Sequence, residues 1–542
     1  MIKKNLLLII MIVSINPFFS VDANNTEVHE NYNPLRKYQS KNQPRWVSEV
    51  LHVLHTVIDA VVPSYHAESI ADVVKVRYTS TDALCEQECQ FINDRLAMVQ
   101  KALNKLDIET TTQSCPRIAW CFSGGGFRAM TTTLFALKAA QEEGLLDASL
   151  YLAGLSGSTW ALAPWISSGT HLNHYINTLG TKTENGLHLA LTAEEFERIS
   201  DYFIYKMEAG EGFSSIDIYG TLLANTLLQS FGKDRFFVTL KQAHKTLEPS
   251  SYPFPIYTAS TPDANPYEWF EITPYEIGSS YTQMYIPIDA YGRHFSQGKS
   301  TKNAPELSLC YLMGVFGSAY DADVRDLITN YSNSIFPSLD HLPKIIEKPI
   351  TNMLHDIMVN HEINEVRIAP SNERNFSYQF SSNPLHDKEH LILMDGGLAC
   401  NLPFPPLLRP SRAVDVIIVY DASADNSNFD TLRETEEYAA RKNLPFPPID
   451  YTNLDRATVR VFKDAHDTSC PVVIYFPMIK NDAYSTTFDP NDCESNSFCN
   501  TFNFKYTQED INTLGGLAYF SVKEHADLIK QTIKDVVSSK NK

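Results

Sequence analysis

Short runs of apolar residues recur along the chain and predict buried strands. They occupy residues 117–122, 150–155, 390–395, 414–420 and 471–477. Apolar residues are continuous within each run rather than alternating, which is typical of parallel strands covered on both faces. Between the runs, apolar residues recur at helical spacing, for example over 129–143 and 522–537. This alternation predicts an α/β fold with a central, mostly parallel sheet.

A long interval, residues 170–390, separates the second predicted strand from the third. It has fewer strand-like runs and is rich in aromatic residues, prolines and polar loops. We therefore expect a large insertion that forms a cap over the site, within a catalytic domain that spans residues 80–542.

The N-terminus has the pattern of an export signal. Lys3 and Lys4 precede an apolar stretch from Leu6 to Ile15, and Val21 and Ala23 have the spacing that signal peptidase favours. The stretch is short for a membrane span. We expect residues 1–23 to be a signal peptide and the mature protein to be secreted or periplasmic.

Residues 24–79 read as a leader that contains one amphipathic helix. The segment 24–45 is polar, and from Val47 apolar residues mark one face of a helix over about 46–62. The polar face of this helix has no Lys or Arg, whereas helices that bind membrane surfaces are usually basic there. We expect it to pack on the protein body.

The charge of the chain restricts its partners. It has 45 Lys and Arg against 64 Asp and Glu, a formal net charge of −19. Nucleic-acid binding and docking to anionic lipid both need basic clusters, and the sequence has none. We expect no nucleic-acid partner, and any transient contact with a membrane or micelle surface must rely on apolar groups.

The nine cysteines give no metal-binding pattern. No paired CxxC and no HExxH supplies zinc-ligand spacing, so we predict no metal site. Cys493 and Cys499 have the spacing for a local disulfide in an oxidising compartment. Cys85 and Cys89 are compatible either with a bridge or with thiols on a buried helix face.

The motif "GLSGSTW" (154–160) follows the second predicted strand and precedes a helix. A serine flanked by glycines in this position is typical of a nucleophile elbow, which makes Ser156 the candidate nucleophile. The fifth position is Ser158 rather than the glycine of G-x-S-x-G. The alternative is that Ser156 only caps the following helix.

Two further motifs supply what a serine ester mechanism needs. "SGGGFR" offers glycine amides for an oxyanion and an arginine, and "MDGG" offers an aspartate at the end of a later predicted strand. Five separate blocks of the sequence together resemble the catalytic domain of the cytosolic phospholipase A2 and phospholipase B family. They are residues 123–130, 154–160, 270–278, 312–320 and the segment from Met394 onward.

The resemblance covers roughly residues 80–540 and implies both a fold and an activity. The implied fold is the three-layer α/β/α arrangement of patatin-related enzymes, and the implied activity is hydrolysis of fatty-acyl esters of phospholipids or lysophospholipids by a Ser/Asp dyad. Ser156 is then the nucleophile and Asp395 the base. Gly125 and Gly126 form the oxyanion hole, and Arg128 pairs with the substrate phosphate.

The resemblance implies no cofactor. Cytosolic family members carry a calcium-dependent lipid-binding module before this domain, and the roughly 80 residues that precede it here lack the carboxylate-rich loops of such a module. We therefore expect no calcium requirement for catalysis. The motif "DGG" replaces the "DSG" of many mammalian members and keeps the aspartate.

Two other functions remain open from the sequence. One is an ordinary α/β-hydrolase triad, for which His466 or His525 lies downstream of Asp395 in the required chain order. The other is a secreted lipid-binding protein that keeps the fold without turnover.

Overall fold

The structure is a computed structural model. It describes residues 72–187, 198–199, 201–202, 205–206, 215–243, 247–318, 371, 373–424, 429–492, 497–501 and 503–541. The predicted signal peptide and the amphipathic helix of the leader lie outside the described residues. The last residues of the leader, Arg77 and Tyr78, form strand β1 of the main sheet.

The centre of the fold is a parallel sheet, as predicted. Its strands run in the spatial order β4 (Phe254–Thr261), β3 (Tyr151–Leu155), β2 (Ile118–Phe122), β13 (Val416–Asp421) and β15 (Val472–Pro477). All neighbours within this group pair in parallel. Four of the five apolar runs become these strands because nearly every residue in them is buried on both faces.

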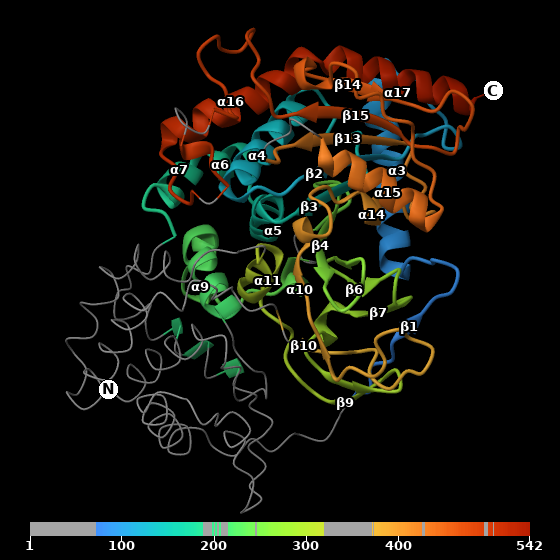
Figure 1. Ribbon diagram of the computed structural model, residues 1–542, viewed down its shortest axis with the longest axis vertical. Helices are drawn as coiled ribbons and strands as arrows, with labels where there is room; N and C mark the ends of the chain where they lie inside the picture. Colours follow the sequence, from blue (N-terminus) through green and yellow to red (C-terminus); the bar gives the residue numbers. More distant parts are fainter. Residues whose placement is uncertain are drawn as a thin grey trace, which may run out of the picture.

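Antiparallel strands extend the sheet at both edges. Beyond β4 lie β5 (Glu268–Ile272), β6 (Glu276–Ser279), β7 (Met284–Pro287) and β1, and beyond β15 lies β14 (Arg460–Phe462) (Figure 1). The expectation that the whole of 170–390 stands apart as a cap is wrong for 254–287, which belongs to the sheet. Strands β5 and β6 carry buried glutamates, so they do not form the apolar runs that marked the others.

The predicted strand over 390–395 is also wrong as a single element. Its first residues form β11 (His390–Leu391), which pairs with β10 (Glu373–Arg374). Its last residues form β12 (Met394–Asp395), which is antiparallel to β4. Between them, Leu393 exchanges hydrogen bonds with Ser371 instead of continuing a ladder.

Helices cover both faces of the parallel strands. Helices α4 (Gly126–Glu142) and α5 (Gly157–Ser168) connect β2 to β3 and β3 towards β4, stepping along the sheet in one direction, and α16 (Gln508–Glu524) packs against α4. Helix α15 (Asp430–Lys442) connects β13 to β15 in the opposite direction. Because such crossovers are right-handed, α15 lies on the other face, which completes the α/β/α layers.

The remaining helices flank this frame. The predicted helix over 522–537 is divided at His525 between α16 and α17 (Ala526–Lys540). Among the described residues, no helix is both long and apolar enough to span a bilayer. The other helices and a small hairpin are α3 (Glu86–Lys105), α6 (Leu172–Asn177), α7 (Leu179–Thr183), α9 (Ser215–Leu227), α10 (Leu240–Ala243), α11 (Leu309–Phe316), α14 (Phe404–Leu407), β8 (His294–Ser296) and β9 (Lys299–Lys302).

Candidate active site

Ser156 sits in a strained turn between β3 and α5. Its φ of 51° and ψ of −121° are unfavourable for a residue with a side chain. The turn is possible because of Gly157, where an added Cβ atom would lie 2.0 Å from the carbonyl oxygen of Gly126. The Ser156 side chain makes no capping hydrogen bond, so the alternative of a simple helix cap is wrong, and the turn has the geometry of a nucleophile elbow.

Ser158 explains why the motif departs from G-x-S-x-G. Its hydroxyl accepts a hydrogen bond from the Leu155 amide at 2.7 Å and donates to the Phe122 carbonyl at 2.9 Å. The side chain thereby ties the end of β3 to the end of β2, beneath the elbow. A glycine could not make these bonds.

The register of β4 brings Asp395 to the same place. Leu155, the last residue of β3, lies opposite Thr258, and Asp395 lies opposite the next residue, Ala259. Because β5 occupies the other edge of β4 from Tyr257 to Thr261, β12 must pair on the edge where β3 has just ended. Asp395 therefore occupies the next position along the same edge of β4 after Leu155. This is the position from which the chain of β3 turns away at Ser156.

Three groups hold Asp395 in this position, and the side chain is only 1% exposed. Its amide donates to the Ser318 hydroxyl at 3.2 Å, and its carbonyl accepts from the Ser260 hydroxyl at 2.9 Å. Its Oδ1 atom accepts from the Gly397 amide at 2.8 Å. No motif in the sequence points to Ser260, whereas Ser318 lies inside one of the blocks that carried the family resemblance.

The glycine loop lies directly against the elbow. A Cβ atom added to Gly124 would lie 3.0 Å from Ser156 Cβ. Gly125 and Gly126 have φ values of 140° and 59°, which favour glycine. Gly124 donates its amide to Asn401, whereas the amides of Gly125 and Gly126 make no hydrogen bond to the described part of the chain. Orphan amides at the start of α4 are suited to an oxyanion.

Arg128 is buried at the beginning of α4, with 3% of its surface exposed. Its Nε atom donates to the Ala422 carbonyl at 2.7 Å, and its Nη1 atom donates to the Cys499 carbonyl at 2.8 Å. These contacts give the guanidinium group a structural role. Its pairing with a substrate phosphate stays a prediction.

Aromatic rings form a cluster that joins the first turns of α4 and α5. Phe127 and Trp160 are in edge contact at 6.2 Å, and Phe504 contacts both, at 5.4 Å and 6.2 Å. Tyr219 of α9 contacts Trp160 at 6.1 Å. Phe504 comes from the loop before α16, and no local motif in the sequence points to it.

The two histidines of the triad alternative have other surroundings. His466 is exposed in a turn, where its amide donates to the Asp464 carboxylate. His525 shares a hydrogen bond with Thr458, with Nε2 2.9 Å from the hydroxyl, and its ring packs on Phe476. Among the described residues, neither histidine is hydrogen-bonded to Ser156 or Asp395.

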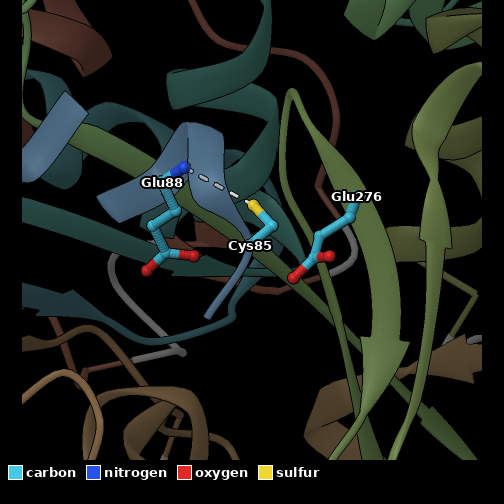
Figure 2. A group of neighbouring side chains, drawn as sticks. All are labelled: Cys85, Glu88 and Glu276. Atoms are coloured by element: carbon cyan, nitrogen blue, oxygen red, sulfur yellow. Dashed lines mark hydrogen bonds between the residues drawn. The ribbon is translucent and has the colours of Figure 1, made fainter. Parts of the chain in front are cut away.

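A separate cluster brings metal-ligating groups together elsewhere in the fold. Cys85, Glu88 and Glu276 offer ligand atoms within 4.8 Å of one another (Figure 2). Arginines neutralise both carboxylates, since Glu88 pairs with Arg412 at 2.8 Å and Glu276 with Arg77 at 2.5 Å. Burial raises the pKa of the Cys85 thiol to about 12, which keeps it protonated. We therefore assign this cluster to a buried ion network that joins α3 to the sheet.

The cysteine predictions have different outcomes. Cys85 and Cys89 are both free thiols, the first buried and the second exposed, so the bridge between them is wrong. Cys493 lies outside the described residues, and its pairing with Cys499 stays a prediction.

A strained serine at the end of a buried strand, beside a glycine loop that opens a helix, is the elbow architecture of α/β hydrolytic enzymes. Residues 118–444 match the model of the lysophospholipase catalytic domain family. The match covers more than half of the chain and includes the glycine loop, Ser156 and Asp395. The protein belongs to this family.

Known proteins similar to the chain agree with this assignment. Cytosolic phospholipase A2 zeta of Mus musculus is 28% identical over 475 residues, which are 75% of this chain and 54% of that protein. The Homo sapiens protein of the same name is 26% identical over 545 residues, 85% of this chain and 63% of that protein. The chain thus spans less than two thirds of these relatives. The structure of human GIVD cytosolic phospholipase A2 superposes with a TM-score of 0.69 at 20% identity, over 86% of this chain and 69% of that one, which supports the fold.

Proposed function

We propose that the protein is an exported phospholipase or lysophospholipase that hydrolyses fatty-acyl esters through a Ser156–Asp395 dyad. The observation that carries the proposal is the pairing of Asp395 with Ala259, one row beyond the Leu155–Thr258 pair. This register aligns a buried carboxylate with the strained elbow from a segment more than two hundred residues away. The family assignment and the relatives named phospholipase A2 support the choice of a phospholipid ester.

The mechanism divides ester hydrolysis into two steps. The Ser156 hydroxyl attacks the ester carbonyl while Asp395 accepts its proton, and the amides of Gly125 and Gly126 stabilise the oxyanion that forms. Asp395 then returns the proton to the leaving glycerol oxygen, which leaves an acyl-enzyme. A water molecule then attacks the acyl-enzyme while Asp395 accepts one of its protons, and Asp395 gives this proton to the Ser156 oxygen as the fatty acid leaves, which restores the serine.

Apolar surface near the dyad suits a fatty chain. Leu398, three residues after Asp395, is 44% exposed. A single exposed leucine is common on protein surfaces. Because this one lies next to the proposed catalytic carboxylate, it is suited to contact an acyl chain or a lipid surface. The acidic chain would then meet a membrane or micelle through such groups rather than through a basic patch.

A panel of diacyl phospholipids, lysophospholipids and uncharged esters, with the products identified, tests the proposal. We expect release of fatty acid from at least one glycerophospholipid, with and without calcium, and none from Ser156→Ala. His466→Ala and His525→Ala serve as matched controls and should keep their activity. Loss of turnover in either histidine variant with the fold intact would favour the triad. A folded wild-type protein that neither hydrolyses these esters nor reacts with a fluorophosphonate probe would favour the inert binder.

A further inference from the structure

Arg128 joins three segments that are far apart in the sequence. It belongs to the first turn of α4, directly after the glycine loop. Its Nε atom holds the carbonyl of Ala422, which follows β13, and its Nη1 atom holds the carbonyl of Cys499, in the short turn Ser497–Cys499. Both acceptors are neutral carbonyls, and bonds from a charged donor to them are stronger than bonds between neutral groups.

The segments held by Arg128 press directly on the two oxyanion glycines. A Cβ atom added to Gly125 would lie 2.9 Å from the Ala422 carbonyl oxygen and 2.9 Å from Arg128 Nη2. A Cβ atom added to Gly126 would lie 2.3 Å from the Thr501 carbonyl oxygen. The backbone of the glycine loop is therefore packed between the Ala422 and Thr501 segments, with the guanidinium group against it.

The placement of a cation here needs a reason. The N-terminus of a helix repels positive charge, and burial of a guanidinium group is costly unless its donors are bonded. The bonds from Nε and Nη1 to the two carbonyls offset part of this cost, and they also fix the walls that orient the amides of Gly125 and Gly126. A displacement of about 1 Å in such donors is enough to lower a rate by about 10²-fold.

We propose that Arg128 is a positioning residue for the oxyanion hole, which acts by clamping the Ala422 and Cys499 segments onto the glycine loop. This inference rests on the proposed function and differs from the phosphate contact that the family resemblance implies. A clamp affects every ester alike, whereas a phosphate contact affects only substrates that carry a phosphate.

The test compares one lysophospholipid with an uncharged monoacylglycerol of the same acyl chain. For Arg128→Ala we expect kcat to fall by about 10²-fold on both esters with KM little changed, because the lost contribution is orientation of the oxyanion donors. Arg128→Lys keeps the charge but not the two-carbonyl geometry, and its kcat should fall on both esters to a smaller extent. Loss confined to the lysophospholipid, or a rise in KM for that substrate alone, would overturn the clamp.

Arg95 provides a matched control. It is also buried, at 2% exposure, and donates to the carbonyls of Ser149, Pro249 and Leu146, far from the glycine loop in the sequence. Arg95→Lys should lower the melting temperature and leave kcat per folded molecule unchanged on both esters. An equal fall of kcat in Arg95→Lys would mean that the Arg128 effect is general destabilisation, and would overturn the clamp.

A second variant covers the case in which the Arg128 variants do not fold. The Ser123 hydroxyl accepts the Ala422 amide at 2.7 Å, so Ser123→Ala loosens the same wall without touching Arg128. A parallel loss on both esters supports the clamp, and unchanged rates on both contradict it. Fluorophosphonate labelling of the wild type separates this question from the proposed function, because an unlabelled Ser156 argues against the hydrolase itself.

Discussion

The hydroxyl of Ser260 donates a hydrogen bond to the backbone carbonyl of Asp395 at 2.9 Å. On the other side of the same residue, the Asp395 amide donates to the Ser318 hydroxyl, which in turn donates to Val315 at the end of α11. The backbone of Asp395 is thus anchored both to β4 and, through Ser318, to α11. These two bonds fix the position of the carboxylate without using its oxygen atoms.

We predict that Ser260→Ala and Ser318→Ala each lower kcat by about tenfold, because loss of one backbone anchor lets the carboxylate move relative to Ser156. KM should change little, since neither hydroxyl is proposed to touch substrate. Steady-state kinetics on a lysophospholipid measure both parameters. Ser521→Ala removes a comparable buried hydroxyl from α16, and an equal loss in that variant would argue against a specific role for the anchors.

Asp395→Asn tests the base without disturbing its surroundings. The amide oxygen of asparagine can still accept the bond from Gly397, so we expect a normal melting temperature and a normal circular dichroism spectrum. Asparagine cannot take the serine proton, so turnover should fall by at least about 10³-fold. The rate of fluorophosphonate labelling should fall as well. Wild-type turnover in this variant would contradict the dyad.

Glu276 predicts a pH-dependent contribution to stability. Burial raises the pKa of this carboxyl from its ordinary value of 4.5 to about 7, although Arg77 lowers it in part. Between these values the folded protein holds a proton that the unfolded chain has released, so the free energy of unfolding decreases as the pH rises from about 4.5 to about 7. The expected loss is on the order of 2–3 kcal/mol.

Glu276→Gln removes this titration. Thermal unfolding at several pH values between 5 and 8 should show that the wild type loses stability relative to the variant as the pH rises. Glu389→Gln is a matched control, because Glu389 pairs with Arg374 at the surface and its side chain is 59% exposed. A constant difference between wild type and Glu276→Gln over this range would mean that Glu276 does not titrate there.

The sequence by itself determined the parallel core and the candidate nucleophile, Ser156. The continuous apolar runs of β2, β3, β13 and β15 are local signals, because a strand buried on both faces needs apolar residues throughout. The glycines around Ser156 are local as well, since the strained turn that they permit spans only a few residues. The motifs that hold the aspartate and the glycine loop are also local, but the roles of their residues came from a resemblance that rests on several short blocks.

Only the tertiary structure decided that Asp395 lines up with the turn at Ser156. A two-residue strand such as β12 has no pattern of its own, and its place depends on an edge of β4 that becomes vacant where β3 ends. The strands β5 and β6 escaped detection because their buried glutamates are neutralised by arginines distant in sequence, among them Arg409 and Arg77. Other contacts also join residues that are far apart in the sequence: the anchors Ser260 and Ser318, the Arg128 clamp and the ring of Phe504. The free energy of such contacts depends on distances in space, which the spacing of residues along the sequence does not give.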